Sequence, residues 1–254
     1  MTAHAPGWRI TVHDSIAAIG RQAWERCRKN ARTAHDFKAL TPDRDSFRQL
    51  ADSSREARDS LPQENDSIHQ INESVSEVDP DNPFISYDFL SALEITGCVG
   101  GPTGWHIAHH ALRDTVGHVL AVLPAYVKSH SRGEYVFDHG WADAYMRAGG
   151  QYYPKLQIAV PFTPVTGPRL LIGETVDRHS AVAALVTGVE ATRARLGASS
   201  VHATFLTAAD AAELTAQDYL LRQDRQFHWR NEDYGTFEDF LGALSARKRK
   251  MIRR

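Results

Sequence analysis

Residues 129–172 read SHSRGEYVFDHGWADAYMRAGGQYYPKLQIAVPFTPVTGPRLLI. No other part of the chain places aromatic, titratable and turn-forming residues so close together. Turns are expected at Gly133 and at Gly149, and an apolar strand is expected to follow Lys155. Its continuation, residues 160–168, contains three prolines, and each proline lacks the N–H that a central strand needs. The sequence therefore predicts that this strand bulges, bends or splays.

Three residues in this stretch suggest acid–base chemistry. Glu134, Asp138 and His139 lie within six positions, and a carboxylate beside an imidazole can take a proton from an amine. In a strand, Glu134 and Asp138 would share one face and His139 would point to the other. Two interpretations stay open, a general-base pair or a hydrogen-bonded set that anchors a helix beginning near Trp141.

Length and composition indicate a globular protein with one large core or two small ones, since 42% of its 254 residues are hydrophobic. No apolar run approaches the roughly 18 residues of a membrane span, and the first residues, MTAHAPGWRI, lack the apolar core of a signal peptide. We therefore expect a cytoplasmic protein without a membrane span. Cys27 and Cys98 should be ordinary reduced thiols. The net charge of −2 argues against a globally basic nucleic-acid binder.

Histidines are frequent enough to raise the question of a metal site. Their spacing gives no pair of ligands on one helix followed by a suitable acid, and His109 and His110 should point to opposite faces of a strand. We expect no metal among the histidines considered, which are His109, His110, His118, His130, His139, His202 and His228.

Hydrophobic periodicity predicts an alternation of strands and helices. Strands are expected at residues 8–12, 105–112, 119–127, 200–206 and 219–229, with the second and third forming an antiparallel hairpin. Helices are expected at residues 15–29 with Ser15 as N-cap, 86–95 with Ser86 as N-cap, 180–196, 208–217 and from 235 to the end.

Residues 28–80 differ from the rest because they contain no Trp or Tyr and are rich in Ser, Asp, Glu and Gln. Such a composition buries little apolar surface. A helix at residues 46–61 has a thin apolar stripe that needs a partner. We expect a mobile insertion here, with a docked helical hairpin as the alternative.

Three segments resemble the FemAB-like family of N-acyltransferases, which act in peptidoglycan biosynthesis or recognition and belong to the GNAT superfamily. They are SHSRGEYVFDHGWADAY, YYPKLQIAVPFTPVTGPRLL and QFHWRNEDYGTFEDFLGALSARKRKMIRR. The resemblance is loose over residues 8–27 and strong over residues 82–254. It implies an α/β (α+β) fold, with a mixed, mostly antiparallel sheet, helices on both faces and splayed central strands. It also implies a GNAT-like lobe at residues 1–234 and a basic helix at 235–254 leading to a second lobe that this chain lacks.

The same resemblance implies transfer of an acyl or aminoacyl group to an amine acceptor, with Glu134 or His139 as base. Asp138, Tyr153, Lys155, Thr163, Thr166, Gly167, Arg169, His202, Gln226 and His228 would bind the substrates. No cofactor is expected to bind tightly. Acyl-CoA or aminoacyl-tRNA would be the donor, although the acids in residues 173–178 suit a CoA pyrophosphate poorly.

Several partners follow from these expectations. The acceptor would be a small molecule or a peptide, and the basic end, residues 247–254, could meet tRNA. The apolar face of the final helix could also drive self-association. An alternative of another class is a recognition module that binds a cell-wall precursor or peptide without catalysis. A nucleic-acid-binding protein is a third reading, which rests on the basic end alone.

Overall fold

A computed structural model describes residues 7–33, 82–136, 138–223, 226, 229 and 231–254. The chain forms two compact units, Met1–Tyr219 and Leu220–Arg254. Most of the predicted insertion, including the helix at 46–61, lies outside the described residues. Residues 28–33 do not belong to an insertion, because they continue helix α1 (Arg21–Thr33).

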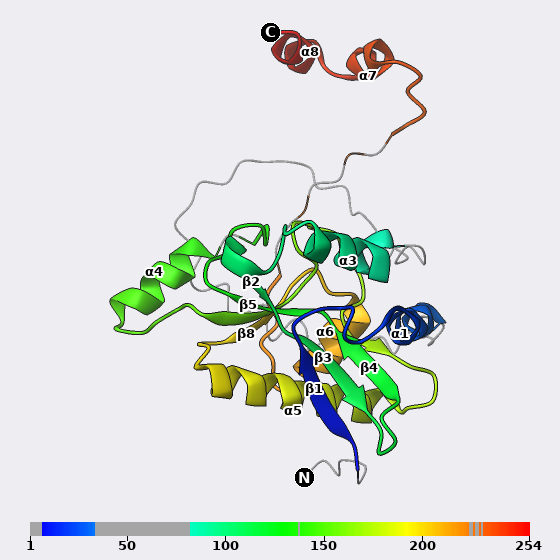
Figure 1. The fold of residues 1–254 in the computed structure, drawn as a ribbon. Coiled ribbons are helices and arrows are strands. Elements are labelled where there is room, and N and C mark those ends of the chain that lie inside the picture. The colour runs from blue at the N-terminus through cyan, green and yellow to red at the C-terminus, as the bar shows by residue number, and fades with distance from the viewer. Residues whose placement is uncertain (1–6, 34–81, 137, 224–225, 227–228, 230) are drawn as a thin grey trace, which may run out of the picture. The chain divides into compact units, whose positions relative to one another are not determined.

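The first unit is built on two four-stranded sheets (Figure 1). Sheet A contains, in spatial order, β1 (Arg9–His13), β3 (His109–Arg113), β4 (Val119–Leu123) and β7 (Leu171–Ile172). Sheet B contains β2 (Trp105–Ile107), β5 (Ala125–Lys128), β6 (Lys155–Ile158) and β8 (Val201–Ala203). Only the pairing of β6 with β8 is parallel among the strands described. The expected mixed, mostly antiparallel class is confirmed.

One bent hairpin connects the two sheets. The two predicted strands do pair, but each is divided, at Ala108 and at Pro124, into a part in sheet B and a part in sheet A. Pro124 has no N–H for a ladder, whereas the Ala108 N–H donates to the Ala125 carbonyl at 2.9 Å. The sequence predicted a single sheet; a proline in mid-strand explains the break.

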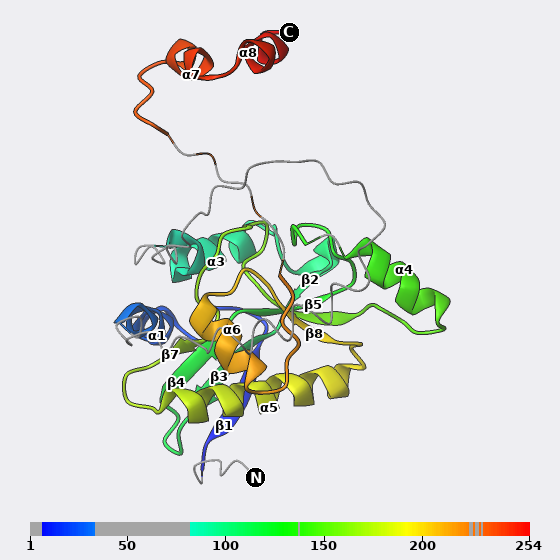
Figure 2. The same ribbon diagram turned by 180° about the vertical axis from the view of Figure 1, so that it is seen from behind.

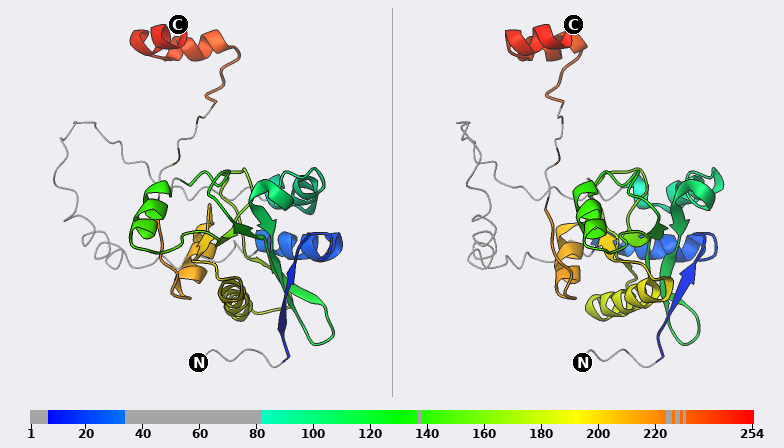
Figure 3. Two further views of the ribbon diagram at one scale, coloured as in Figure 1. Left: turned by 60° about the vertical axis from the view of Figure 1, so that its left-hand side comes forward. Right: turned by 90° about the vertical axis from the view of Figure 1, so that its left-hand side faces the viewer.

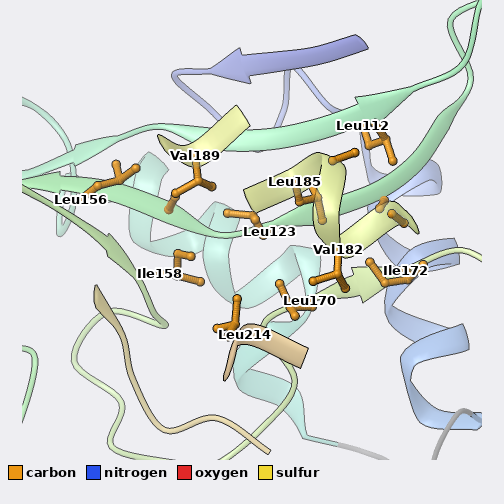
Figure 4. Packing of buried hydrophobic residues seen from close by; sticks show 14 of the residues in the cluster. Leu112, Leu123, Leu156, Ile158, Leu170, Ile172, Val182, Leu185, Val189 and Leu214 are labelled. Atoms are coloured by element: carbon orange, nitrogen blue, oxygen red, sulfur yellow. The ribbon is translucent and has the colours of Figure 1, made fainter. Parts of the chain in front are cut away.

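Helices cover both faces of the strands, as expected (Figures 1 and 2). Helix α5 (Arg178–Leu196), capped by Asp177, lies on the opposite side of the strands from α3 (Tyr87–Ile95) (Figure 3). Under α5, Leu112 and Leu123 meet Leu185 and Val189 in the main core, which Leu214 of α6 (Ala208–Thr215) completes (Figure 4).

The other face of sheet A packs against α1, where Trp24 and Cys27 join Ala111 and Val122 in a second buried cluster. Both cysteines are free thiols, as predicted, and burial raises the pKa of Cys27 to about 11. His109 and His110 do point to opposite faces. The His109 ring bonds Glu94 on one side, and the His110 ring bonds Thr192 of α5 on the other.

The two predicted N-caps have different outcomes. The Ser86 hydroxyl accepts a hydrogen bond from the Phe89 N–H, which confirms the start of α3. The predicted start at Ser15 is wrong, because Ser15 caps only a turn through the Ala18 N–H and α1 begins at Arg21. The Glu94 carboxylate holds the Ile16 N–H with both oxygens and so fixes this turn from outside the segment.

Two predictions near the C-terminus need correction. No described residue of the segment 219–229 lies in a strand. The single final helix is instead α7 (Phe237–Ala243) and α8 (Ala246–Ile252), because Leu244 is extended and Ser245 caps a new helix. In the part of the chain that the structure describes, no helix has both the length and the apolar character to cross a membrane.

Candidate functional site

Two lysines are buried side by side in sheet B. Lys128 ends β5 and pairs directly with Lys155, the first residue of β6. Because side chains alternate along a strand, Leu156 and Ile158 enter the core under α5 while Lys155 faces the other way. The strand register places seven residues on this second face. One is Ile107, and the other six, which are polar or aromatic, we term the polar face of sheet B: Trp105, Tyr126, Lys128, Lys155, Gln157 and His202.

The loop after β5 covers the polar face with carboxylates. The fully buried Lys155 ammonium donates to Asp138 Oδ2 at 2.6 Å, to Glu134 Oε2 at 2.8 Å and to Ser131 Oγ at 2.9 Å. Asp138 Oδ2 also accepts from the Ser131 hydroxyl and from the Tyr152 hydroxyl. A buried ion cluster therefore ties the loop and the start of α4 (His139–Arg147) to β6.

Tyr153 joins this cluster through Ser131. The two hydroxyl oxygens lie 2.7 Å apart. Because Ser131 gives its proton to Asp138, Tyr153 is the donor in this second bond. The ring of Tyr152 lies between those of Tyr153 and His202, at centroid distances of 5.0 and 6.0 Å. Of the predicted substrate residues, Lys155 thus contacts both Glu134 and Asp138, Tyr153 is connected to them through Ser131, and His202 packs against Tyr152.

Lys128 has fewer anionic partners than Lys155. Its ammonium lies 3.4 Å from the centroid of the Trp105 ring and donates to the Arg132 carbonyl at 3.2 Å. Glu134 Oε1 is 3.8 Å away. Burial, together with smaller contributions from the cations Lys155 and Arg132, lowers the pKa of Lys128 to about 7 despite the attraction of Glu134.

The two carboxylates differ in basicity. Burial raises the pKa of Glu134 against the opposing effect of Lys155 and Lys128. Burial also acts on Asp138, but hydrogen bonds from Lys155, Ser131 and Tyr152 outweigh it and hold that pKa below its usual value. Glu134 is therefore the better proton acceptor near neutral pH.

Unsatisfied polar atoms gather in this site. The described part of the chain contains eight buried side-chain nitrogen or oxygen atoms without a hydrogen-bond partner. Five belong to the polar face or its covering loop: Trp105 Nε1, Tyr126 Oη, Glu134 Oε1, Asp138 Oδ1 and Gln157 Oε1. Such atoms are rare in native proteins, and their concentration at one place is typical of a ligand site.

The proline-rich segment lies against the loop that carries Glu134. After β6 the chain leaves sheet B, as the prolines predicted, and Gly167 forms an isolated bridge with Leu206, beyond the end of β8. The Gly133 carbonyl accepts from the Phe162 N–H at 3.0 Å. The Phe162 ring is 42% exposed and lies 5.5 Å from the Trp105 ring. The proline-rich segment and the loop that carries Glu134 are therefore in direct contact.

Backbone geometry makes this contact tight. Phe162 has a φ of +57°, which a bulky residue adopts only under strain. Gly133 has a φ of +79°, and a Cβ there would lie 2.6 Å from the Phe162 ring. Only glycine fits at position 133 without movement of that ring.

Other predicted residues of this segment hold the loop instead of facing Lys155. The Thr163 hydroxyl donates to the Pro161 carbonyl, and the Thr166 carbonyl accepts from the Asn82 amide. The Gly167 N–H donates to the Phe205 carbonyl. Arg169 is buried and donates to the Val165 carbonyl, and burial lowers its pKa to about 10.

The predicted pairing of Glu134 with His139 is not formed. His139 is exposed as the first residue of α4, whereas the Glu134 carboxylate is buried against Lys155. The segment that was considered as a strand is a loop followed by a helix, so Asp138 and His139 diverge. Gln226 belongs to the second compact unit, and His228 lies outside the described residues.

Sequence reasoning missed several members of the site: Trp105, Tyr126, Lys128, Ser131, Tyr152 and Gln157. The pattern that could have revealed one of them is the position of Lys128, which like the predicted Lys155 lies in a short strand next to an apolar residue. A lysine at such a position is rarely buried unless it has a partner.

A family model described as FemAB-like, peptidoglycan biosynthesis/recognition, matches residues 62–254. This range contains every residue of the polar face and of the loop that covers it. No curated protein matches the chain.

Proposed function

Since the chain belongs to the FemAB-like family of peptidoglycan biosynthesis/recognition, we propose that it is an N-acyltransferase that moves an acyl or aminoacyl group onto an amine. The observation that carries this proposal is the pair of buried carboxylate oxygens, Glu134 Oε1 and Asp138 Oδ1, that lack hydrogen-bond donors within the described chain. An ionised carboxylate only accepts hydrogen bonds, so a ligand that satisfies both oxygens must donate them. An amine does so. The acceptor class that we propose is a peptide or small molecule with a free amine.

Glu134 is the proposed base. Its raised pKa suits proton transfer near neutral pH, and its Oε1 atom has no other donor. The amine nitrogen attacks the carbonyl carbon of the donor, a C–N bond forms and Glu134 Oε1 takes the amine proton. The bond from the carbonyl carbon to the donor's oxygen or sulfur then breaks, and the leaving group takes up the proton. Lys155, which is itself held by Asp138, holds the Glu134 carboxylate in place.

The donor is proposed to be acyl-CoA or aminoacyl-tRNA, with its phosphates bound away from the first turn of α5. The free N–H groups of a helix N-terminus commonly hold a pyrophosphate. At α5 the chain's own Asp177 carboxylate accepts from the Ser180 N–H at 2.8 Å and from the Ser180 hydroxyl at 2.7 Å. A second anion at this helix end would meet that carboxylate.

A recognition module is the alternative, and one observation favours it. Lys155 already donates to both Glu134 and Asp138 inside a dehydrated cluster, which weakens Glu134 as a base. Such a site would hold an amine-bearing peptide of the cell wall without acylating it.

Replacement of Glu134 by Gln tests the transferase proposal. Purified chain is incubated with amine-bearing peptides and either donor, and the N-acylated product is quantified by mass spectrometry. We expect Glu134→Gln to lower the transfer rate by about 10²–10⁴-fold, because the base is lost while the shape is kept. Asp143→Asn, an exposed acid on α4, is the matched control and should transfer at the wild-type rate.

Two results would count against the transferase. Equal rates for Glu134→Gln and the wild type would remove Glu134 from the chemistry. Tight binding of an amine-bearing peptide without any product, with either donor, would instead establish the recognition module.

A further inference from the structure

Lys128 is a buried cation to which the proposed mechanism assigns no function. Its side chain is fully buried, and its ammonium lies over Trp105 and 3.8 Å from Glu134 Oε1. This is the same carboxylate oxygen that lacks a hydrogen-bond donor. An amine bound at Glu134 Oε1 would therefore be a close neighbour of the Lys128 ammonium.

The net charge of the buried cluster determines whether an ammonium ligand can bind next to Lys128. The two lysines and two carboxylates of the cluster sum to zero when all four are ionised: Lys128 and Lys155 carry two positive charges, Glu134 and Asp138 two negative ones. An ammonium ligand would add an uncompensated positive charge to a buried site, which is strongly unfavourable. If one lysine gives up its proton, the total returns to zero.

We propose, building on the proposed function, that Lys128 is a specificity-determining residue that exchanges its own proton for the ammonium group of the acceptor. The ammonium enters at Glu134 Oε1, and the Lys128 proton leaves to solvent. The site then selects ligands whose reacting nitrogen enters as an ammonium, because only these compensate for the charge that Lys128 loses. Before the nitrogen attacks, the bound ammonium returns one proton to the neutral Lys128 amine beside Glu134 Oε1, and Glu134 takes the second proton as the C–N bond forms.

Lys128 rather than Lys155 is the residue that gives up its proton. Lys155 donates to three side-chain oxygens at 2.6–2.9 Å, two of them on carboxylates. Lys128 donates to one neutral carbonyl and lies against an aromatic ring, and its pKa is already lowered to about 7. The charged and titratable groups around Lys128 are Glu134, Asp138, Lys155, Arg132, His130, Tyr152 and Tyr153.

The exchange has a measurable pH dependence. Below about pH 7 Lys128 is protonated in the free protein, so each ammonium that binds releases about one proton. Affinity should therefore rise about tenfold per pH unit up to pH 7 and level off above it. A residue with a purely structural role would produce neither effect.

Isothermal titration calorimetry tests the exchange. The probe is Nα-acetyl-L-lysyl-D-alanyl-D-alanine, whose side chain carries its single amine, titrated at pH 6 in two buffers of different ionisation enthalpy. The wild-type chain should release about one proton per probe bound. Lys128→Met, which keeps an unbranched side chain against Trp105, should release none and bind about tenfold more tightly at pH 6. Lys128→Arg, a permanent cation, should bind weakly at every pH.

The control is Lys250→Met, which removes an exposed lysine of α8 and should release protons and bind the probe as the wild type does. Other outcomes distinguish a failure of the role of Lys128 from a failure of the proposed function on which it rests. Probe binding without proton release by the unaltered chain, or weaker binding by Lys128→Met at pH 6, would overturn the role of Lys128 and leave the amine site standing. Absence of probe binding to the wild type from pH 6 to pH 8 would overturn both proposals.

Discussion

Sheets A and B have the same number of strands but bury different chemistry. Sheet A packs apolar side chains on both faces, with Leu112 under α5 and Val122 against α1. Sheet B packs apolar side chains under α5, whereas its other face combines the rings of Trp105 and Tyr126 with the buried polar residues Lys128, Lys155 and Gln157. Burial of apolar surface is favourable by itself, whereas burial of charge is tolerated only with partners.

The comparison suggests different roles for the two sheets, with sheet A holding the fold and sheet B forming the ligand site. Sheet A can be assigned to holding the fold, because its buried polar groups are few and His109 and His110 both have partners. Sheet B carries the paired lysines, and the loop that covers it carries the unsatisfied carboxylate oxygens of Glu134 and Asp138. Buried ion pairs add little net stability, and unsatisfied buried oxygens require an explanation through a ligand. Variants in each sheet can test this division.

The largest expected effect is in sheet B. Lys155→Met leaves Glu134 and Asp138 buried without the ammonium that binds them both, which should cost about 3–5 kcal/mol of unfolding free energy. Urea denaturation at neutral pH measures it. A triple variant that adds Glu134→Gln and Asp138→Asn should recover most of the loss, because no buried charge is then left. If the single variant were as stable as the wild type, the ion cluster would not be buried as described.

A smaller effect is expected in sheet A. Leu112→Ala creates a cavity beneath α5 and should cost about 2–5 kcal/mol in the same urea experiment. Affinity for the amine probe, measured per folded molecule, should stay at the wild-type value. Leu112→Met, which keeps the volume, should cost less than about 1.5 kcal/mol. A changed probe affinity in Leu112→Ala would show that the two sheets do not divide their roles.

The smallest effect is a pH dependence of stability that comes from Lys128. Its pKa is about 7 in the folded chain and 10.5 in its ordinary state, so between these values the unfolded chain holds a proton that the folded chain has released. The free energy of unfolding should therefore rise with pH in that window, by at most about 1.4 kcal/mol per pH unit, and fall as pH drops toward 7. The difference between wild type and Lys128→Met at pH 7 and pH 9 isolates this contribution. A difference that is constant across the two pH values would contradict it.

Local signals predicted much of the fold. Ser86 caps α3 because its hydroxyl reaches the Phe89 N–H within one turn, and the three prolines end β6 because they lack N–H groups. Both effects depend on neighbours in the sequence. The start of α1 could not be predicted in this way, because the Glu94 carboxylate, 78 positions away, holds the Ile16 N–H.

The site was predictable only in part for the same reason. Glu134, Asp138, Tyr153 and Lys155 lie in one stretch, and their types alone suggested a site. Lys128 becomes a member through strand register, which sets it opposite Lys155 and beside Trp105. The predicted pairing of His139 with Glu134 was wrong. Asp138 is buried and the next residue, His139, is exposed, and the sequence does not show at which residue the loop ends and the helix begins.

In evolutionary terms, Gly133 and Phe162 cannot change independently. A larger residue at position 133 would collide with the Phe162 ring, and its backbone would sit in a conformation that side chains disfavour. A lineage that loses the ring first gains room for a side chain at 133, whereas the reverse order passes through a damaged intermediate. Because of the contact between the two loops, a substitution of Phe162 is expected to precede any substitution of Gly133.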